Sequence, residues 1–179
     1  MTTLITILAV TAGIIALLLL VALLSKKAYQ VQREIIINAP LQKVFDYIKH
    51  LKNQDNFNKW VMVDPAMKKE FVGTDGTEGF IYRWNGNKKA GEGEQEIKAI
   101  TEGKNIKTEV RFIRPFAGIA NADMATESLP GNQTKITWNN GSKIKFPMNI
   151  LVSVIEKMLA KDMDTSLNNL KIILEEHPV

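Results

Sequence analysis

Three glutamates at alternate positions, Glu92, Glu94 and Glu96, are the side chains of this sequence that most resemble a cation site. In a β-strand, residues two apart point to the same side and lie roughly 7 Å apart. That spacing is too wide for rigid carboxylates to ligate one ion together. We therefore expect these glutamates to form the solvated face of a sheet and to bind no metal.

Four polar side chains near the C-terminus have the spacing of calcium-loop ligands, namely Asp162, Asp164, Ser166 and Asn168. A calcium loop needs a glycine at its sixth position and a glutamate at its twelfth. Leu167 and Ile173 occupy those two positions here. We expect the four side chains to lie on the solvated side of a helix.

Two glycine-rich stretches resemble nucleotide-binding loops in part. Residues 73–79 lack the final Gly-Lys-Ser/Thr of a phosphate loop, and residues 91–96 lack the third glycine of a dinucleotide fingerprint. The glutamates of the second stretch would also repel a pyrophosphate. We predict a hairpin turn at residues 73–79 and no cofactor.

Few groups are available for catalysis. The chain has no cysteine, and neither His50 nor His177 is placed beside a serine and a carboxylate as in a triad. Tyr82 and Arg83 are adjacent, but strand alternation points them to opposite faces. A cyclase or dehydratase could still use one Tyr, Arg or Glu in a dry cavity. That reaction class stays open, while a non-enzymatic role is favoured.

The first element of the chain that the sequence predicts is an unbroken apolar run from Leu4 to Leu24. As a helix it spans roughly the 30 Å hydrocarbon core of a bilayer. A cleaved signal peptide normally has a basic segment before the run and an A-x-A-like site after it, and both are missing here. A buried core helix normally has a polar face. We predict a single-pass transmembrane anchor.

Basic residues follow the apolar run and do not precede it. Lys26, Lys27 and Arg33 lie directly after it, which favours a cytoplasmic location for everything downstream. The chain then divides into an N-terminal tail (1–3), a transmembrane helix (4–24), a basic tether (25–29) and one domain (30–179).

The composition of the domain excludes several classes of protein. Its length of about 150 residues allows one substantial core. The chain carries a net charge of +4, and removal of Lys26 and Lys27 leaves +2 on the domain, which is too balanced for a dedicated nucleic-acid binder. Without cysteine it has no disulfide and no thiolate metal site.

Hydrophobic periodicity predicts the elements of the domain. Residues 30–37 are rich in β-branched residues and form a strand, and a helix begins after Pro40 and ends near Leu51. A second short helix leads to Trp60, and several antiparallel strands follow. A long helix over residues 149–176 has an apolar stripe, formed by Ile155, Leu159, Met163, Leu167, Leu170 and Leu174.

The turn at Asn85 and Gly86 predicts a register for two of the strands. As a two-residue hairpin loop it would pair Trp84 with Asn87 and Tyr82 with Lys89. Alternation then defines one apolar inner face, formed by Phe80, Tyr82, Trp84, Gly91, Gly93, Gln95, Ile97, Ala99, Ile106, Thr108, Val110, Phe112, Ala120, Ala122, Met124, Thr126, Ile136 and Trp138. The long helix is expected to pack on this face.

Several short motifs occur in the order typical of a known family. They are Ile37-Asn38-Ala39-Pro40 with Val44-Phe45, Trp60, residues 73–79 leading into Tyr82-Arg83-Trp84, Gly91-Glu92-Gly93, Arg114-Pro115-Phe116, Thr134-Lys135-Ile136-Thr137-Trp138 and Leu167-Asn168-Asn169-Leu170-Lys171. With them the domain resembles the START-like polyketide cyclase/dehydrase and lipid-transport superfamily, often labelled SRPBCC. The resemblance implies an α+β helix-grip fold, in which a curved antiparallel sheet wraps around the C-terminal helix. It also implies an apolar cavity between them for a hydrophobic small molecule or lipid.

Candidate cavity residues follow from that resemblance and from the inner face. Polar handles for a ligand are Tyr82, Gln95, Thr108 and Thr126, and the walls are Trp84, Ile97, Phe112, Met124, Trp138, Leu159 and Met163. Small inner-face residues such as Ala122 would leave space for a ligand, or would equally allow the helix to pack closely on the sheet. All of these side chains could instead belong to an ordinary core.

Three functions remain open. The leading hypothesis is a membrane-anchored domain that binds a hydrophobic small molecule or lipid. The alternatives are a cyclase- or dehydratase-like enzyme and a protein-interaction module. Because the tether is short, we expect capture, presentation or sensing of a ligand at one membrane.

Overall fold

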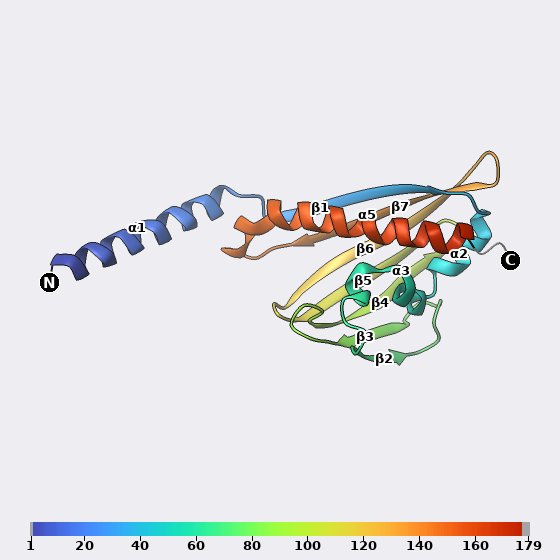
Figure 1. Cartoon of the computed structure of the whole chain (residues 1–179), viewed down its shortest axis with the longest axis horizontal. Coiled ribbons are helices and arrows are strands. Elements are labelled where there is room, and N and C mark those ends of the chain that lie inside the picture. The colour runs from blue at the N-terminus through green and yellow to red at the C-terminus, as the bar shows by residue number, and fades with distance from the viewer. Residues whose placement is uncertain (1, 177–179) are drawn as a thin grey trace.

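The computed structural model describes residues 2–176, so that His177 lies outside the described residues. Its first element is α1 (Thr2–Leu24), which stands away from the rest of the molecule (Figure 1). Nearly all residues of α1 are exposed, and its most apolar window has a mean hydropathy of 3.0. The helix thus has the length and composition of one that crosses a membrane, which signal sequences share.

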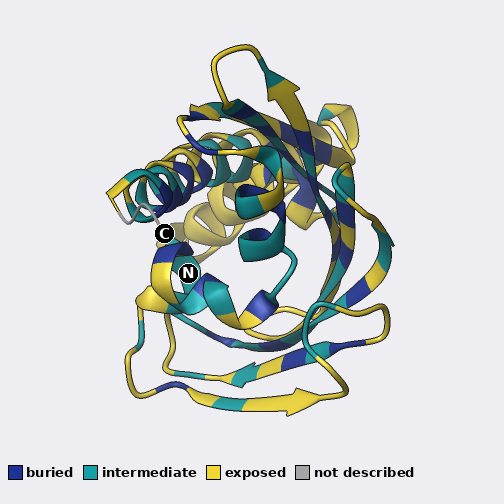
Figure 2. Ribbon diagram, turned by 90° about the vertical axis from the view of Figure 1, so that its right-hand side faces the viewer, coloured by how far each residue is buried: buried dark blue, intermediate teal, exposed yellow. Residues whose placement is uncertain are grey.

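Seven antiparallel strands form one sheet in the order β1-β7-β6-β5-β4-β3-β2. They are β1 (Ala28–Ile37), β2 (Lys68–Val72), β3 (Ile81–Asn85), β4 (Glu92–Thr101), β5 (Asn105–Arg114), β6 (Gly118–Leu129) and β7 (Gln133–Lys143). Viewed along the length of the molecule, the sheet curves around one side of the helices (Figure 2). The first strand, β1, is an edge of this sheet and pairs with the last strand, β7.

The helices lie on the concave side of the sheet (Figure 2). They are α2 (Leu41–Ile48), the 3-10 turn η1 (Leu51–Asn53), α3 (Gln54–Phe57), α4 (Lys59–Met62), the 3-10 turn η2 (Met148–Leu151) and α5 (Val152–Glu176). The long helix α5 runs beside β1 (Figure 1). The predicted α+β helix-grip architecture is therefore confirmed.

The core forms where the apolar stripes of these helices meet the inner face of the sheet. From α2, Val44 and Phe45 are completely buried. From α5, the buried residues are Val152, Met163, Ser166, Leu167, Leu170 and Leu174. The expectation that Ser166 lies on the solvated side of the helix is wrong, because its hydroxyl accepts a hydrogen bond from the backbone N–H of Lys59 at 3.0 Å. Full burial of an aliphatic or aromatic side chain contributes roughly 1.5–3 kcal/mol. Ile155 and Leu159, nearer the start of α5, are only half-buried, so the second half of this helix is the part that the sheet holds most closely.

The predicted register of the β3–β4 hairpin is wrong, although its assignment of faces is correct as far as Ile97. Trp84 pairs with Gly93 and Tyr82 with Gln95, so the loop spans residues 86–91 instead of two residues. The Asp64 carboxylate, from a distant segment, accepts a hydrogen bond from the backbone N–H of Asn87 at 2.7 Å and supports this wider loop. The shift is by an even number of residues, so side chains up to Ile97 keep their faces. A bulge between Ile97 and Ala99 then places Ile100 opposite Ile106, so Ile100 and not the predicted Ala99 faces the core.

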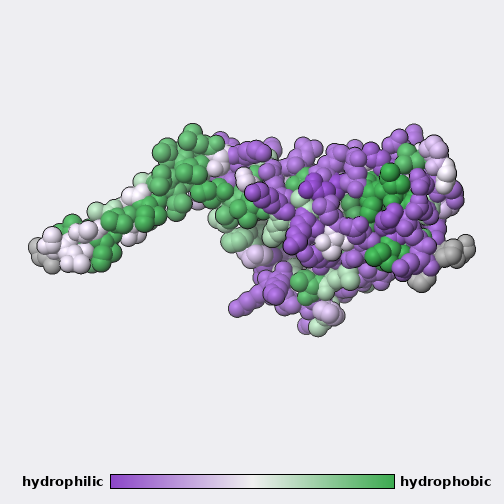
Figure 3. Space-filling model, turned by 45° about the horizontal axis from the view of Figure 1, so that its top comes forward, coloured by the Kyte–Doolittle hydropathy of each residue, from purple (hydrophilic) through white to green (hydrophobic). Residues whose placement is uncertain are grey.

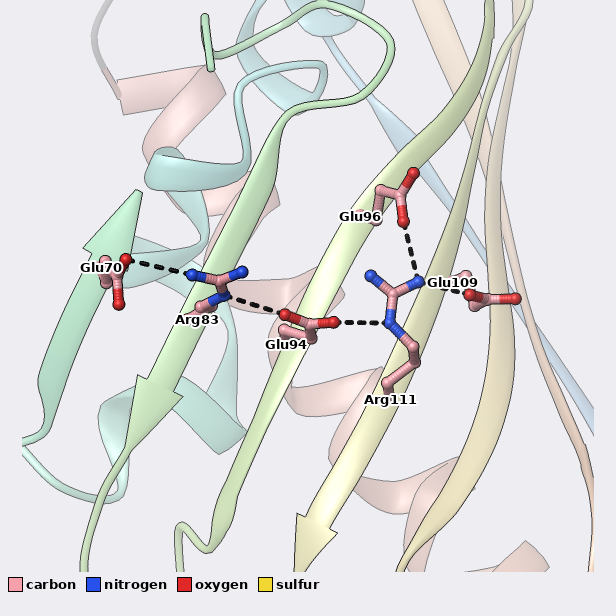
Figure 4. Close-up of polar contacts among 6 residues, drawn as sticks. All are labelled: Glu70, Arg83, Glu94, Glu96, Glu109 and Arg111. Carbon is pink, nitrogen blue, oxygen red and sulfur yellow. Dashed lines mark hydrogen bonds and ion pairs between the residues drawn. The ribbon is translucent and has the colours of Figure 1, made fainter. Parts of the chain in front are cut away.

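The outer face carries a row of ion pairs across β2, β3, β4 and β5 (Figure 4). Glu94 accepts hydrogen bonds from Nε of Arg83 at 2.9 Å and from Nε of Arg111 at 2.7 Å. Arg111 also contacts Glu96 and Glu109, with its Nη1 2.8 Å from Glu96. The glutamates of β4 therefore serve cross-strand pairing on a solvated face, as their alternation indicated.

This row of ion pairs predicts an acid-dependent loss of stability. Hydrogen bonds from Arg83 and Arg111 hold the pKa of Glu94 below its ordinary value of 4.5. A carboxylate with a lowered folded-state pKa stabilises the fold above its ordinary pKa, and this contribution disappears as the pH falls through the folded-state pKa. We expect the melting temperature of the full chain in detergent to fall below pH 4.5, and Arg111→Gln to reduce that fall. The matched variant Arg33→Gln, outside the row, should keep the wild-type slope, and equal slopes for all three proteins would contradict the prediction.

Candidate functional site

A small cavity lies between the middle of the sheet and the helices α2 to α3. It is lined by Ile48, Leu51, Gln54, Gln95, Ile106, Thr108, Ala122, Met124 and Trp138, and we call it the interior cavity. Its volume is about 20 Å³. A space of this size holds about one water molecule. The interior is therefore nearly filled by side chains, and the cavity is much smaller than a bound lipid.

Two polar side chains of the sheet meet in the interior cavity. Nε2 of Gln95 donates a hydrogen bond to the Thr108 hydroxyl at 3.0 Å, and this hydroxyl donates to the carbonyl oxygen of Ala122 at 2.8 Å. Among residues 2–176, none donates a hydrogen bond to the side-chain carbonyl of Gln95. An amide with an available acceptor among apolar walls is the kind of group that orients a ligand in a pocket.

A second amide enters the interior cavity from the opposite side. Gln54 begins α3 and is 8% exposed, and its Oε1 accepts a hydrogen bond from Nδ2 of Asn58 at 2.9 Å. The preceding turn is held in place by Asp75, whose carboxylate accepts from the backbone N–H of Leu51 at 2.8 Å. The short helices thus position Gln54 and Leu51 over the inner face of the sheet.

Tyr82 and Thr126, the other two predicted polar handles, do not line the interior cavity. The Tyr82 hydroxyl donates to Oδ1 of Asp55 at 3.0 Å, and Asp55 also pairs with Lys69 at 2.8 Å. Burial and the negative charge of Asp55 raise the pKa of Tyr82 far above its ordinary value, so this phenol stays protonated. The Thr126 hydroxyl donates to the carbonyl oxygen of Gly103 at 3.1 Å and ties β6 to the β4–β5 turn.

The predicted walls divide into three groups. Met124 and Trp138 line the interior cavity, whereas Ile97 and Met163 are completely buried in the surrounding core. The remaining three, Trp84, Phe112 and Leu159, are half-buried or exposed. Of the predicted site residues, the structure thus brings together Gln95, Thr108, Met124 and Trp138.

The small residues of the inner face serve close packing at one position and leave space at another. The ring of Trp84 lies across Gly93, where an added Cβ would meet its Cζ2 at 2.6 Å. Trp84 also contacts Phe112 edge-on, with 6.2 Å between the ring centroids. Ala122, in contrast, lines the interior cavity. The small residues of the inner face thus allow close packing at Gly93 and leave space beside Ala122.

The interior cavity has no group for acid–base chemistry among the residues that the structure describes. Its lining consists of apolar residues, two glutamines and a threonine, and none of these side chains titrates. Apolar contact together with a few hydrogen bonds is what this arrangement can provide chemically. A cyclase or dehydratase mechanism would need an acid or base from outside the lining.

The end of α1 is fastened to the domain. Asn149, in η2, is 1% exposed, and its Nδ2 donates to the carbonyl oxygen of Ala22 at 2.6 Å. Nearby, the backbone N–H of Ile144 donates to the carbonyl oxygen of Lys27 at 2.9 Å. Because β1 already begins at Ala28, the link between α1 and the sheet is residues 25–27, shorter than the predicted 25–29.

A curved antiparallel sheet that grips a long C-terminal helix over a small interior cavity defines a helix-grip protein. The family model described as polyketide cyclase / dehydrase and lipid transport matches residues 28–175, and the chain belongs to this family. The match begins where β1 begins, so α1 is an addition to the family domain. The comparison with curated proteins gave no match.

Solved structures from several different organisms have the same fold. Norcoclaurine synthase from Thalictrum flavum, in complex with dopamine and hydroxybenzaldehyde, is 12% identical with a TM-score of 0.66, over 87% of this chain and 91% of that one. A protein from Mesorhizobium loti is 14% identical with a TM-score of 0.63, over 84% and 100% of the two chains. A protein from Chromobacterium violaceum is 10% identical with a TM-score of 0.60, over 82% and 96%. At these identities the likeness shows the fold.

Proposed function

We propose that this protein is a membrane-anchored binding protein for a hydrophobic small molecule or lipid, which it holds between the sheet and the helices. The observation that carries the proposal is the Gln95 amide, which is fixed by Thr108 and lines the interior cavity together with Gln54 and apolar side chains. Membership of a family that includes lipid transport supports it. So does the norcoclaurine synthase complex, in which a protein of this fold is bound to small aromatic compounds.

A ligand would have to enlarge the interior cavity. The side chains best able to yield are Met124, which is flexible, and Leu51 and Gln54, which lie on turns of three and four residues. The residues of the sheet are held by continuous strand pairing and would stay in place. Binding is then coupled to movement of η1 and α3, and the free energy of that movement lowers the affinity for ligands that fill little space.

We further propose that α1 is an uncleaved anchor with the domain on the cytoplasmic side. Cleavage after α1 would remove the Ala22 carbonyl, at 2.6 Å, and leave Nδ2 of the buried Asn149 with the Ser25 carbonyl, at 3.3 Å, as its acceptor, so the uncleaved chain satisfies this amide better. The basic residues Lys26 and Lys27 directly follow α1, and such residues favour the cytoplasm.

Native mass spectrometry of the full chain, released from detergent and screened against membrane lipids and lipophilic metabolites, tests the binding function. We expect a retained ligand in the wild type. Ala122→Leu fills the interior cavity, and its affinity should be about tenfold lower, because loss of 1.4 kcal/mol of contact has this effect. The matched variant Ala125→Leu places the same side chain on the other face of β6 and should bind like the wild type.

Two results would contradict the proposal. One is a chain that stays empty with every compound. The other is retention of the same ligand by Ala122→Leu and the wild type with equal affinity, which would place the ligand elsewhere.

A further inference from the structure

Exposed apolar side chains gather at the end of the domain from which α1 emerges. They come from the β5–β6 connection, the β7–α5 connection and the first turns of α5. They include Ile113 (57%), near the end of β5 just before this connection, and Phe116 (69%), Phe146 (51%), Met148 (40%), Val154 (63%) and Met158 (56%). Hydrophobic surface continues from α1 onto this end of the domain (Figure 3). We call it the anchor-side end.

Two turns at the opposite end of the domain have a different surface, although Ile36 (45%) and Ile172 (51%) are exposed elsewhere on the domain. The β6–β7 turn, at the end away from α1 (Figure 1), consists of exposed Pro130, Gly131 and Asn132. The β4–β5 turn carries exposed Glu102 and Lys104. Single exposed apolar residues are normal on soluble proteins, but a contiguous group at one end indicates an interaction surface.

The position of α1 determines what this surface can meet. Phe146 and Met148 lie within three residues before Asn149 in the sequence. Asn149 donates a hydrogen bond to the carbonyl of Ala22, in the last turn of α1. From Ala22 towards its N-terminus, α1 leads away from the domain (Figure 1). Leu24, the last residue of α1, is 83% exposed. A bilayer that α1 crosses therefore begins beside Phe146 and Met148.

Charged residues around the anchor-side end fit the surface of a bilayer. Lys26, Lys143, Lys145 and Lys157 are exposed there. Two carboxylates of the neighbouring elements already have basic partners: Glu156 lies 3.6 Å from Lys26, and Glu92 lies 2.7 Å from Arg114. Aromatic and aliphatic side chains beside lysines are typical of segments that lie in the headgroup region of anionic membranes.

We infer that the anchor-side end is seated in the headgroup layer of the bilayer that α1 crosses, with Phe116 and Phe146 inserted and the lysines on anionic lipid. This inference rests on the proposed anchor. It favours the bilayer over a second copy of the chain or a partner protein, because α1 already brings a membrane to this surface and the surrounding charge matches anionic lipid.

The inference has a structural consequence for the binding site. On β5, Phe112 lies on the same face as Thr108, nearer the anchor-side end, and it is 41% exposed. Trp84 packs against it. Along the strands, these two aromatic residues lie between the anchor-side end and the residues that line the interior cavity.

Fluorescence quenching in nanodiscs tests the inference with the full chain. Because the chain has no cysteine, single labels can be attached after Ala117→Cys and Lys145→Cys at the anchor-side end, Ser128→Cys beside the β6–β7 turn and Leu8→Cys in α1. The nanodiscs contain phosphatidylcholine and phosphatidylglycerol with a lipid that carries a quencher near its headgroup. The labels at 117 and 145 should lose roughly half of their emission, because an interfacial segment lies within reach of a shallow quencher. The label at 128 should lose none.

The label at position 8 in α1 shows whether a negative result reflects failure of this inference or failure of the anchor. In the measurement with this label, the quencher is placed deep in the acyl chains. If label 8 is quenched and labels 117 and 145 behave like label 128, the anchor stands and the inference is overturned. If label 8 is not quenched either, the anchor fails and the inference fails with it. Quenching at 117 and 145 in the presence of phosphatidylglycerol that disappears in pure phosphatidylcholine supports both the insertion and the role of the lysines.

Discussion

Two lysines in the middle of α1, introduced as Ile14→Lys with Leu18→Lys, are expected to release the chain from membranes. A lysine at the centre of a membrane-spanning helix costs roughly 2.5–3.5 kcal/mol, so the pair costs about 5–7 kcal/mol. Ile14 and Leu18 are both more than half exposed and have no protein surface to cover them. Alkaline carbonate extraction of membranes from cells that express the full chain measures the effect. We expect the wild type in the pellet and the double variant in the supernatant.

The control for this experiment keeps the helix apolar. Ile14→Leu with Leu18→Ile changes the same two positions and should leave the chain in the pellet. Carbonate also removes proteins that are held only at the membrane surface, so the contacts of the anchor-side end do not mask the result. A lysine variant that stays in the pellet would show that α1 is not the anchor.

Truncation of the tryptophan in the interior cavity, Trp138→Ala, is expected to have the largest effect on folding. Trp138 is 4% exposed and packs edge-on against Trp60, with 5.8 Å between the ring centroids. Replacement of a buried Trp or Phe by Ala typically costs about 3–5 kcal/mol, a large share of the stability of a domain. Denaturant unfolding of the full chain in detergent measures the loss.

The same variant shows whether the interior can accept an apolar molecule. The space left by the indole adjoins the interior cavity, and apolar cavities created in this way bind compounds of matching shape. Indole at millimolar concentration should therefore recover part of the lost free energy of unfolding in Trp138→Ala. Trp84→Ala, at a half-buried position, should lose less stability and gain less from indole. Indole that stabilises neither variant would argue against a site around Trp138.

Sequence periodicity predicted faces well and registers poorly. Alternation alone placed Gln95, Thr108 and Met124 on one face, because side chains of a strand alternate regardless of which residues they pair with. The wider β3–β4 loop is held by local hydrogen bonds from Lys89 and Ala90 to Asn87 and also by a contact between Asp64 and Asn87, which lie far apart in the sequence. A local turn signal contains no information about such a contact.

The interior cavity was predictable only on its sheet side. Gln54 lies on a helix of four residues, too short to show a period, and its place opposite Gln95 depends on how Asp75 holds the preceding turn. The volume of the cavity was not predictable either. It is the small difference between the space enclosed by the backbone and the side chains that fill it. The ring of Trp84 over Gly93 is one case in which a small residue left no space.

The position of β1 at the edge beside β7 determines the order in which this protein can assemble. α1 and β1 leave the ribosome before the other strands, yet β1 can pair only after β7 has been made. Contacts between residues so distant in sequence close late and slow folding. During synthesis β1 is an unpaired, β-branched strand, of the kind that promotes aggregation. A helix already inserted in the bilayer would hold this strand at the membrane surface, apart from other nascent chains, until its partner arrives.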